Sequence, residues 1–290
     1  MKTAFIVNIS QKWQKNALEI IKVLSAFSSY EKEIFVVDKN VPDSTERHAE
    51  KIIGGQFERI AVVGGDGTLN RLINCLYGKN CLEKYLLSVI PLGTCNDFAR
   101  ALGFNKEELM PALKSVESDV TKNIRVAKVN GKCFLNNAGF GRKNPTAARR
   151  SAFRDLLDMQ PVHFQAAPEG KAPIEGVCLM MFAANAPYFN NGLRFSGDCD
   201  PTDDILDFFF VRNISKIKLM AKLAAGRLGA PLGGSGDGIA VRVGTQKLSL
   251  RTGTPVWIMT DGETAPELSE IKEALFEFAG TCRFTAPQNR

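Results

Sequence analysis

The sequence predicts an α/β domain followed by an all-β domain. Three observations carry this prediction. The chain has 290 residues, more than the roughly 100–200 residues of one ordinary domain. Strand and helix patterns alternate up to about residue 125, as in a parallel α/β sheet. After that point short strands follow one another directly, separated by turn signals, which favours an antiparallel sheet or sandwich.

Hydrophobic periodicity places the elements of the α/β half. Short runs of apolar, mostly β-branched residues indicate buried strands, and apolar residues spaced three and four apart indicate helices. The double glycine Gly54-Gly55 ends the second helix. The expected strands are 5–7, 34–37, 59–63 and 86–90, and the expected helices are 16–27 and 44–53.

The pattern of the second half predicts strands joined by tight turns. Asn130-Gly131, Gly244-Thr245 and Thr252-Gly253 are turn signals between apolar runs. Two helical patterns, 146–159 and 215–228, interrupt the strands. The expected strands are 126–129, 133–136, 177–183, 206–211, 239–243, 247–250 and 256–259. We therefore expect domains at 1–125 and 126–290, and the last 20 or so residues are candidates to return to the first domain.

Composition narrows the class of protein. With 44% hydrophobic and 23% charged residues the chain is globular, not disordered or fibrous. A net charge of +6 suits contact with phosphates or an anionic membrane but falls short of a nucleic-acid binder, and solubility alone explains it equally well. The seven cysteines contain no CxxC pair, which indicates reduced thiols in a cytosolic protein.

A glycine-rich loop after the third strand is the strongest motif. It reads Gly64-Gly65-Asp66-Gly67-Thr68-Leu69-Asn70 and opens a helix whose apolar stripe includes Leu72 and Leu76. Glycines let backbone N–H groups approach a phosphate, and the helix N-terminus adds positive potential. Asp66 then fits a magnesium ion, a hydroxyl or backbone donors. The alternative is a tight turn in which Asp66 or Thr68 merely caps the helix.

A second loop repeats this arrangement after the fourth strand. It runs from Pro91 to Arg100 and contains Gly93-Thr94-Cys95-Asn96-Asp97. Asn96 or Asp97 is placed to cap a helix that ends at Gly103. Loops after neighbouring parallel strands converge at the carboxyl edge of the sheet, where α/β proteins bind ligands. The pair of loops therefore predicts a phosphate site.

Together the two loops resemble the diacylglycerol kinase catalytic family. The similarity is closest to the soluble bacterial lipid kinases, with sphingosine and ceramide kinases as relatives, and the glycine loop alone is shared with NAD kinases and phosphofructokinases. The resemblance implies a nucleotide-binding α/β domain, a β-sandwich lipid-substrate domain, and ATP with Mg²⁺ in the cleft between them. It implies that residues 64–70 and Thr94 bind the ATP phosphates, that Asn96 and Asp97 support the second loop, and that Asn8 lies near the nucleotide.

The resemblance also assigns a metal site in the second domain. Asp203-Asp204-Ile205-Leu206-Asp207 is similar to the family's Asp-Asp-Gly-x-Leu segment, in which an acid and two carbonyls hold Mg²⁺. The ligands here would be Asp204 with the carbonyls of Pro201 and Leu206. This chain has Ile205 where the family has glycine. The alternative is an acidic turn before a core strand.

The last motif is Asp261-Gly262-Glu263, which follows an apolar strand. It resembles the family's Asp-Gly-Glu segment, whose acid takes the proton from the lipid hydroxyl. The resemblance implies that Glu263 is the base, with Asp261 as metal or water partner and Asp66 as the third catalytic carboxylate. Asp-Gly is also an ordinary hairpin turn, which is the alternative.

A basic cluster follows the motif Gly139-Phe140-Gly141. It consists of Arg142, Lys143, Arg149, Arg150 and Arg154 beside apolar residues. A membrane-facing lid has this composition, and so does a solvated helix face. No apolar run has the length of a transmembrane helix. We therefore expect a cytoplasmic protein that associates transiently with an anionic membrane surface.

The sequence thus predicts an ATP-dependent lipid kinase that phosphorylates a diacylglycerol-like or sphingoid hydroxyl. Two alternatives stay open: a soluble-metabolite kinase of the NAD-kinase type, and a non-catalytic nucleotide-binding regulator. The expected partners are ATP, a lipid and the membrane surface, without nucleic acid. A homodimer is compatible with the sequence, which does not identify the lipid.

Overall fold

The computed structural model describes residues 2–8, 31–38, 41–105, 109–141, 158–195, 198–227, 229–231 and 238–287. It divides into two compact units. Unit 1 comprises Met1–Ile124 and Gly280–Arg290, and unit 2 comprises Arg125–Ala279. The sequence-based division was 1–125 and 126–290, with the last 20 or so residues as candidates for the first domain. The predicted helix 16–27 lies outside the described residues, as does nearly all of the predicted helix 146–159.

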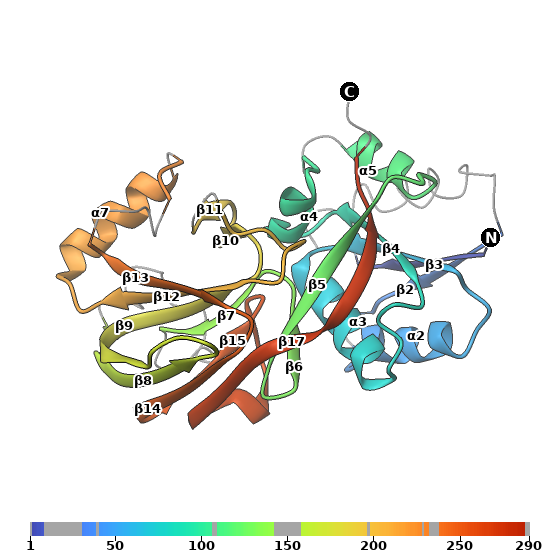
Figure 1. The fold of residues 1–290 in the computed structure, drawn as a ribbon. Coiled ribbons are helices and arrows are strands. Elements are labelled where there is room, and N and C mark those ends of the chain that lie inside the picture. The colour runs from blue at the N-terminus through green and yellow to red at the C-terminus, as the bar shows by residue number, and fades with distance from the viewer. Residues whose placement is uncertain are drawn as a thin grey trace. The chain divides into compact units, whose positions relative to one another are not determined.

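Unit 1 is a parallel sheet with helices on its faces, as predicted (Figure 1). The strand order β17-β4-β3-β1-β2 is parallel throughout. Helices α2 and α3 lie side by side on one face and α5 lies on the other (Figure 1). The elements are β1 (Thr3–Val7), β2 (Lys32–Val36), α2 (Ser44–Ile53), β3 (Arg59–Gly64), α3 (Asp66–Gly78), β4 (Leu86–Pro91), α4 (Asp97–Leu102) and α5 (Leu109–Ser115).

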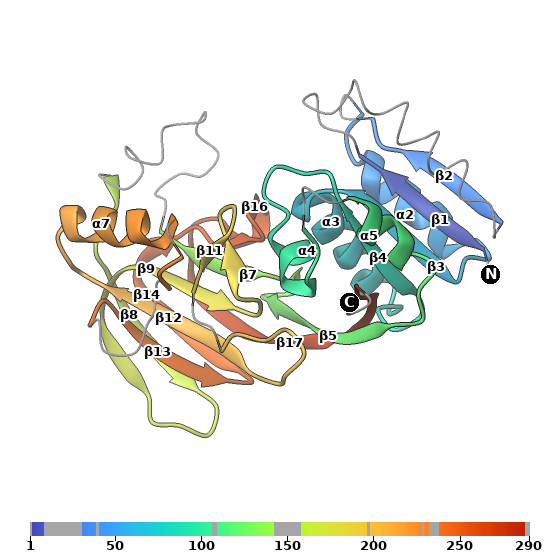
Figure 2. The same cartoon turned by 90° about the horizontal axis from the view of Figure 1, so that it is seen from above.

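Unit 2 is antiparallel (Figure 2). It contains β5 (Thr121–Val129), which begins in unit 1, and β17 (Ile271–Thr285), which ends there. Its helix α7 (Lys216–Arg227) confirms the predicted helix 215–228. The other strands are β6 (Lys132–Phe134), β7 (Asn137–Phe140), β8 (Val162–Pro168), β9 (Ile174–Ala184), β10 (Tyr188–Phe189), β11 (Leu193–Arg194), β12 (Leu206–Arg212), β13 (Ala240–Thr245), β14 (Leu248–Val256), β15 (Met259–Thr260) and β16 (Glu263–Thr264).

Strand β12 runs through the centre of unit 2 and is buried on both faces. Phe208 meets Phe276 of β17 edge-on at 5.5 Å between ring centroids, and Phe210 stacks on Phe164 of β8 at 4.3 Å. On the opposite face Phe209 stacks on Phe195, 5.3 Å away. Because side chains alternate along a strand, a run of phenylalanines fills both faces. β12 therefore packs face to face on β8 and β17, as in a sandwich.

One sequence-based expectation of unit 2 is wrong. Thr252-Gly253 does not form a turn, because β14 runs through both residues. Thr252 is buried and pairs with Phe164 of β8. The pairing of β14 with β17 shifts register between Arg251 and Val256 instead. The glycine thus lies near an irregularity in a continuous strand, which is a common place for glycine in sheets.

The end of the chain completes unit 1. Arg283 and Phe284 of β17 pair in parallel with β4. Thr285 is fully buried and its hydroxyl donates to the Ser88 hydroxyl at 3.0 Å. Phe284 is fully buried and meets Phe98 of α4 at 4.9 Å between ring centroids. Within the described residues, no helix is long and apolar enough to cross a bilayer.

These contacts predict a large cost for truncating Phe284. Removing a buried phenylalanine ring leaves a cavity, so Phe284→Ala should lower the free energy of unfolding by about 3–5 kcal/mol. Urea denaturation measures this change. Val36→Ala is the control because Val36 is 55% exposed, and it should change stability by less than about 0.5 kcal/mol. Equal stabilities of the two variants would show that β17 does not belong to the core of unit 1.

Candidate functional site

The carboxyl ends of β1, β3 and β4 lie next to one another in unit 1. β1 pairs with β2 on one side and β3 on the other, so the chain reverses its direction of winding there. This is the place where doubly wound α/β sheets bind ligands. Asn8 follows β1, the first glycine loop follows β3 and the second loop follows β4. The sheet therefore brings both predicted phosphate loops to one edge.

The two loops touch through glycine backbone. A Cβ built on Gly93 would lie 2.3 Å from the Cα of Gly65 and 2.8 Å from Oδ1 of Asn96. A Cβ on Gly65 would lie 2.9 Å from the Cα of Gly93. All three distances are too short for a side chain at either glycine. The backbone of the opposite loop cannot move aside as a flexible side chain can. Gly65 and Gly93 are therefore required for the approach of one loop to the other.

Asp66 clamps the second loop. Its two carboxylate oxygens accept the backbone N–H groups of Asp97 and Phe98, each at 3.0 Å. These are the first N–H groups of α4, which have no partner within their own helix. The negative charge also suits the positive end of the helix. Asp66 thus caps a helix, as the sequence-based alternative allowed, but the helix is α4 and not its own helix α3.

Asn96 and Asp97 shape the second loop from within. Asn96 has φ 54° and is 4% exposed, in the left-handed region that asparagine tolerates best after glycine. Its side chain accepts from the Gly93 N–H at 2.8 Å and donates to the Gly93 carbonyl at 2.9 Å. Asp97 accepts from Nη1 of Arg100 at 2.8 Å. Asn96 makes no capping bond to α4, so the expected cap from its side chain is replaced by Asp66.

The first glycine loop presents the N-terminus of α3. Gly65 precedes the helix, and the helix begins at Asp66 and Gly67. Thr68 is buried, and its hydroxyl accepts from Nδ2 of Asn8 at 2.7 Å. Asn8 Oδ1 is buried and has no hydrogen-bond partner within the described part of the chain. The helix N-terminus and this amide form a polar edge that suits an anion.

Four other residues of the predicted phosphate set differ in exposure. Leu69 is 2% exposed and its side chain packs in the core, so only its backbone belongs to the loop. Asn70 is buried and accepts from the side-chain amide of Asn74 at 3.1 Å. Thr94 is exposed beside Gly93. Gly64 is buried, and a Cβ there would lie 3.2 Å from the Thr68 hydroxyl.

In unit 2, Asp261 anchors a second polypeptide segment. Its carboxylate accepts the backbone N–H groups of Leu135 at 2.9 Å, Asn136 at 2.8 Å and Asn137 at 3.0 Å. Asp261 and Gly262 have φ 50° and 83°, as the two-residue hairpin between β15 and β16 requires. The Asp-Gly motif therefore is a hairpin turn, and its carboxylate fixes the entry to β7.

Glu263 follows this turn and is half-buried as the first residue of β16. It pairs with Thr260 across the hairpin. Because Asp261 fixes the hairpin to residues 135–137, the position of the Glu263 backbone is fixed as well. The Asp261 carboxylate is occupied by three backbone N–H groups, and Glu263 is the next carboxylate along the chain.

The predicted metal ligands form a different set of bonds. Asp204 Oδ1 lies 2.7 Å from Nε of Arg125, and the Pro201 carbonyl accepts the Arg125 N–H at 2.8 Å. Leu206 is fully buried at the start of β12. Burial raises the pKa of the neighbouring Asp203 carboxyl, the Ile205 N–H opposes this rise, and the carboxylate of Asp200 adds to it. In the described ranges, no three acidic, histidine or cysteine side chains converge on a point where a metal ion could sit.

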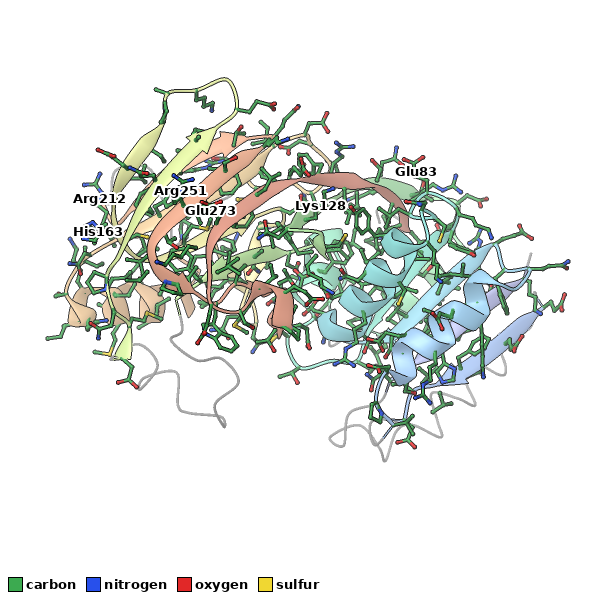
Figure 3. The ribbon with its side chains drawn as sticks, turned by 90° about the horizontal axis from the view of Figure 1, so that it is seen from below. Glu83, Lys128, His163, Arg212, Arg251 and Glu273 are labelled. Atoms are coloured by element: carbon green, nitrogen blue, oxygen red, sulfur yellow. The ribbon has the colours of Figure 1, made fainter. Side chains whose placement is uncertain are left out.

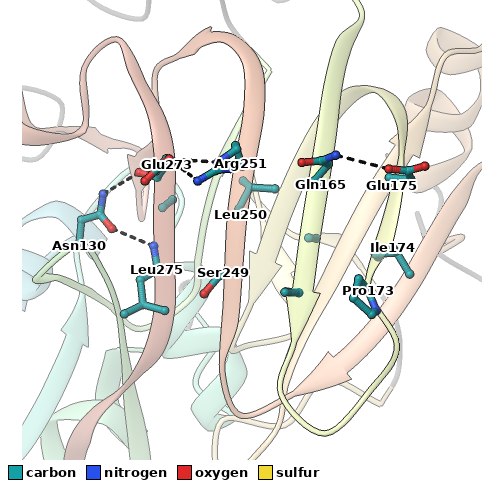
Figure 4. Close-up of a pocket in the computed structure, with 13 residues that line it drawn as sticks. Asn130, Gln165, Pro173, Ile174, Glu175, Ser249, Leu250, Arg251, Glu273 and Leu275 are labelled. Atoms are coloured by element: carbon teal, nitrogen blue, oxygen red, sulfur yellow. Dashed lines mark hydrogen bonds and ion pairs between the residues drawn. The ribbon is translucent and has the colours of Figure 1, made fainter.

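A hollow of about 820 Å³ lies on the exposed face of unit 2, over β8, β14 and β17. Arg251 and Glu273 lie side by side on this face (Figure 3). They form an ion pair of 2.9 Å, Gln165 donates to Glu175 at 3.5 Å, and Asn130 bonds to the backbone of β17 (Figure 4). None of the predicted site residues lines this hollow. It is a solvated sheet face whose polar groups largely pair with one another.

Comparison with known proteins agrees with the motifs. Residues 2–129 match the model of the diacylglycerol kinase catalytic domain. Over 87 residues the chain is 44% identical to a diacylglycerol kinase of Bacillus subtilis, which covers 30% of this chain and 28% of that protein. Over 115 residues it is 32% identical to a diacylglycerol kinase of Staphylococcus epidermidis, covering 40% of this chain and 35% of that protein. The matches thus span about a third of these relatives.

Two solved structures from Bacillus anthracis strain Sterne share the fold. One, described as a diacylglycerol kinase, has a TM-score of 0.76 at 22% identity, covering 98% of this chain and 96% of the other. The second has a TM-score of 0.78 at 21% identity with the same coverage. The predicted fold class, an α/β part followed by an all-β part, is confirmed across the chain. The resemblance inferred from the two loops is confirmed for residues 2–129.

The contact between the loops makes a specific prediction for glycine substitutions. Gly93→Ala should lower the free energy of unfolding by about 1–3 kcal/mol, because the added methyl would overlap the backbone of Gly65. Gly78→Ala is the matched control, since a Cβ there meets nothing within 4 Å at the end of α3. It should leave stability unchanged or raise it by up to about 1 kcal/mol. Chemical denaturation measures the free energy of unfolding of both variants. A Gly93→Ala protein as stable as Gly78→Ala would contradict the contact between the two loops.

Proposed function

We propose, from the diacylglycerol kinase catalytic domain that residues 2–129 match, that this chain is an ATP-dependent lipid kinase. It transfers the γ-phosphate of ATP to a lipid hydroxyl of the diacylglycerol or sphingoid kind. One observation carries the proposal: the glycine loop and the second loop meet at Gly65 and Gly93 and are locked together by Asp66. The glycine loop alone would fit several kinds of kinase, whereas the pair of loops favours the lipid branch.

In this proposal the first loop holds the nucleotide. The N–H groups at the start of α3 face the phosphates, with Asn8, Thr68 and Thr94 beside them. The buried Asn8 oxygen, which has no partner in the described residues, is available to a ligand donor or a bound water. Phosphoryl transfer depends mainly on positioning and charge neutralisation, and Mg²⁺ arrives as part of the Mg·ATP substrate. Asp66 positions the loops instead of taking part in the chemistry.

The general base in this proposal is Glu263. It accepts the proton of the lipid hydroxyl as that oxygen attacks the γ-phosphorus and the bond to the β-phosphate oxygen breaks. Asp261 is a positioning residue, since three backbone N–H groups occupy its carboxylate. Glu263 belongs to unit 2 and the phosphate loops belong to unit 1. The reaction therefore needs both units.

A non-catalytic nucleotide-binding regulator is the second candidate, and one observation favours it. Three carboxylates with predicted roles in chemistry, Asp66, Asp204 and Asp261, all hold other parts of the protein. A protein that kept the fold but lost turnover would keep such anchors. The third reading, a soluble-metabolite kinase of the NAD-kinase type, has less support because the motif from Pro91 to Arg100 is the part that NAD kinases do not share.

A lipid substrate requires contact with a membrane surface, which we propose is peripheral and transient and made from the cytoplasm. The basic cluster Arg142, Lys143, Arg149, Arg150 and Arg154 is the proposed contact, and it lies outside the described residues. Anionic lipid attracts such a cluster by about 1 kcal/mol for each basic residue near the surface. A homodimer remains a prediction of the sequence.

The test is transfer of labelled γ-phosphate from Mg·ATP to diacylglycerol and sphingosine in mixed micelles. Glu263→Gln should lower kcat by about 10²–10⁴-fold, because the base is lost while the shape is kept. Its melting temperature should stay that of the parent. Glu267→Gln is the matched control, an exposed carboxylate in the same segment that pairs with Lys132 at 3.0 Å. It should retain full activity.

Other outcomes discriminate between the candidates. A Glu263→Gln protein with parental kcat would exclude Glu263 as the base. Tight binding of ATP without turnover on any hydroxyl lipid would favour the regulator. Formation of NADP from NAD and ATP would favour the soluble-metabolite kinase.

A further inference from the structure

The segment from Asp198 to Asp207 concentrates negative charge at the entry to β12. It contains five aspartates within ten residues, and each of them has a bonding partner in the structure. Such a segment is the kind of place where a protein uses a divalent cation to offset repulsion between carboxylates. The partners that the structure supplies show how the charge is offset in this chain. The five are Asp198, Asp200, Asp203, Asp204 and Asp207.

Two of the aspartates act locally, within the turn. Asp200 accepts the Thr202 N–H at 2.9 Å and the Thr202 hydroxyl at 2.7 Å. Asp203 accepts the Ile205 N–H at 2.9 Å. Hydrogen bonds from an aspartate to backbone two residues further on stabilise turns. These two side chains therefore set the shape of the turn.

Two others share one arginine. Nε of Arg242, on β13, lies 2.9 Å from Asp207 Oδ1, and its Nη1 lies 2.7 Å from Asp198 Oδ2. Asp207 is 3% exposed, so its charge needs this partner. Together with Asp203, the Asp207 pair fixes the start of β12 against β13. Of the five aspartates, only Asp204 pairs with a different cation, which is Arg125.

Arg125 meets Asp204 and is itself held on several sides. Its N–H donates to the Pro201 carbonyl at 2.8 Å, and its Nε lies 2.7 Å from Asp204 Oδ1. The carbonyl of Arg125 accepts from Nδ2 of Asn185 at 2.8 Å. Its guanidinium carbon lies 4.6 Å from the ring centroid of Phe278, a cation–π contact. Arg125 is thus fixed in place, and the pair with Asp204 is a close ion pair.

These contacts occupy two of the three groups that the resemblance implies as magnesium ligands at this turn. Of the three expected ligands, the Asp204 oxygen is 2.7 Å from a guanidinium nitrogen and the Pro201 carbonyl already accepts a backbone N–H. Magnesium needs ligands at about 2.0–2.1 Å in near-octahedral geometry. An ion on the same Asp204 oxygen would have to displace Arg125 or lie against its positive charge. The residues therefore do not fit the metal.

The replacement of glycine by Ile205 agrees with this reading. Ile205 is not among the residues with a positive φ, so this backbone has no need of glycine. Its Cγ2 lies 2.9 Å from where a Cβ would stand on Gly244, which shows that Ile205 covers the backbone of β13. Pairing between β12 and β13 places Leu206 opposite Thr245, one residue further on. The turn is thus shaped by packing and hydrogen bonds between protein groups.

We propose that the guanidinium of Arg125 is the resident cation of this turn and takes the place of a divalent metal ion. Arg125 positions the turn that begins β12, and the fold of unit 2 needs no Mg²⁺ there. The inference concerns the folded structure of unit 2, and it holds whether or not the chain is a lipid kinase. Its test is therefore a stability measurement on the full chain without nucleotide or lipid.

The experiment measures the melting temperature in EDTA and in 5 mM MgCl₂. The parent should melt at the same temperature in both. Arg125→Gln should melt about 1–4 °C lower in EDTA, because it loses an ion pair with an exposed carboxylate and a cation–π contact with Phe278. Added MgCl₂ should recover at least half of that loss, because the Asp204 carboxylate no longer faces a guanidinium and can accept the ion. Arg125→Lys should retain most of the parental melting temperature without metal.

Two controls make the result specific. Arg251→Gln removes another ion pair of unit 2, that with Glu273 at 2.9 Å, and should show no dependence on MgCl₂. The double variant Arg125→Gln/Asp204→Asn should lose the recovery by MgCl₂. The proposal is overturned if the parent gains stability from MgCl₂ through Asp204, or if Arg125→Gln is not destabilised. It is also overturned if MgCl₂ fails to recover Arg125→Gln or recovers the double variant equally.

Discussion

The close approach of Gly65 and Gly93 is the constraint on which the candidate site depends. Two backbones can meet at this distance only if neither carries a side chain, and the loops must then be held together because van der Waals contact alone is weak. Asp66 holds the loops together by capping α4. Asn96 keeps the second loop in its left-handed bend. The edge that we propose for phosphate binding is therefore held in place before any ligand arrives, which lowers the entropic cost of binding.

A carboxylate also joins two distant segments in unit 2. Asp261 accepts three backbone N–H groups of a segment more than 120 residues away in the sequence. Arg125 holds the acidic turn in a similar way, because it pairs with Asp204 and donates to the Pro201 carbonyl. Charged side chains thus join distant loops in both units. Glu263 follows such an anchored turn, and we propose it as the base because it stands at the acid of the family's Asp-Gly-Glu segment.

Much of the fold could be predicted from local pattern, because buried strands and helix stripes are visible in short windows. Helix α2 has the predicted bounds, and strands β1 to β4 of unit 1 were each located. β8 and β17 were not predicted, although Val162, Phe164 and Ala166, and Ala274 and Phe276, alternate as a half-buried strand should. The partners of Asp66 and of Asp261, and the role of Arg125, could not be predicted, since their contacts join residues far apart in the chain.

Hydrogen–deuterium exchange with and without ATP tests the central claim that the two joined loops form the nucleotide site. If they do, ATP slows exchange in peptides covering residues 64–70 and 92–98, because their N–H groups are then ordered or bonded to phosphate. Peptides on the exposed face of β8 and β14 should exchange at unchanged rates. ATP-dependent protection elsewhere, with none in the two loops, would contradict the account.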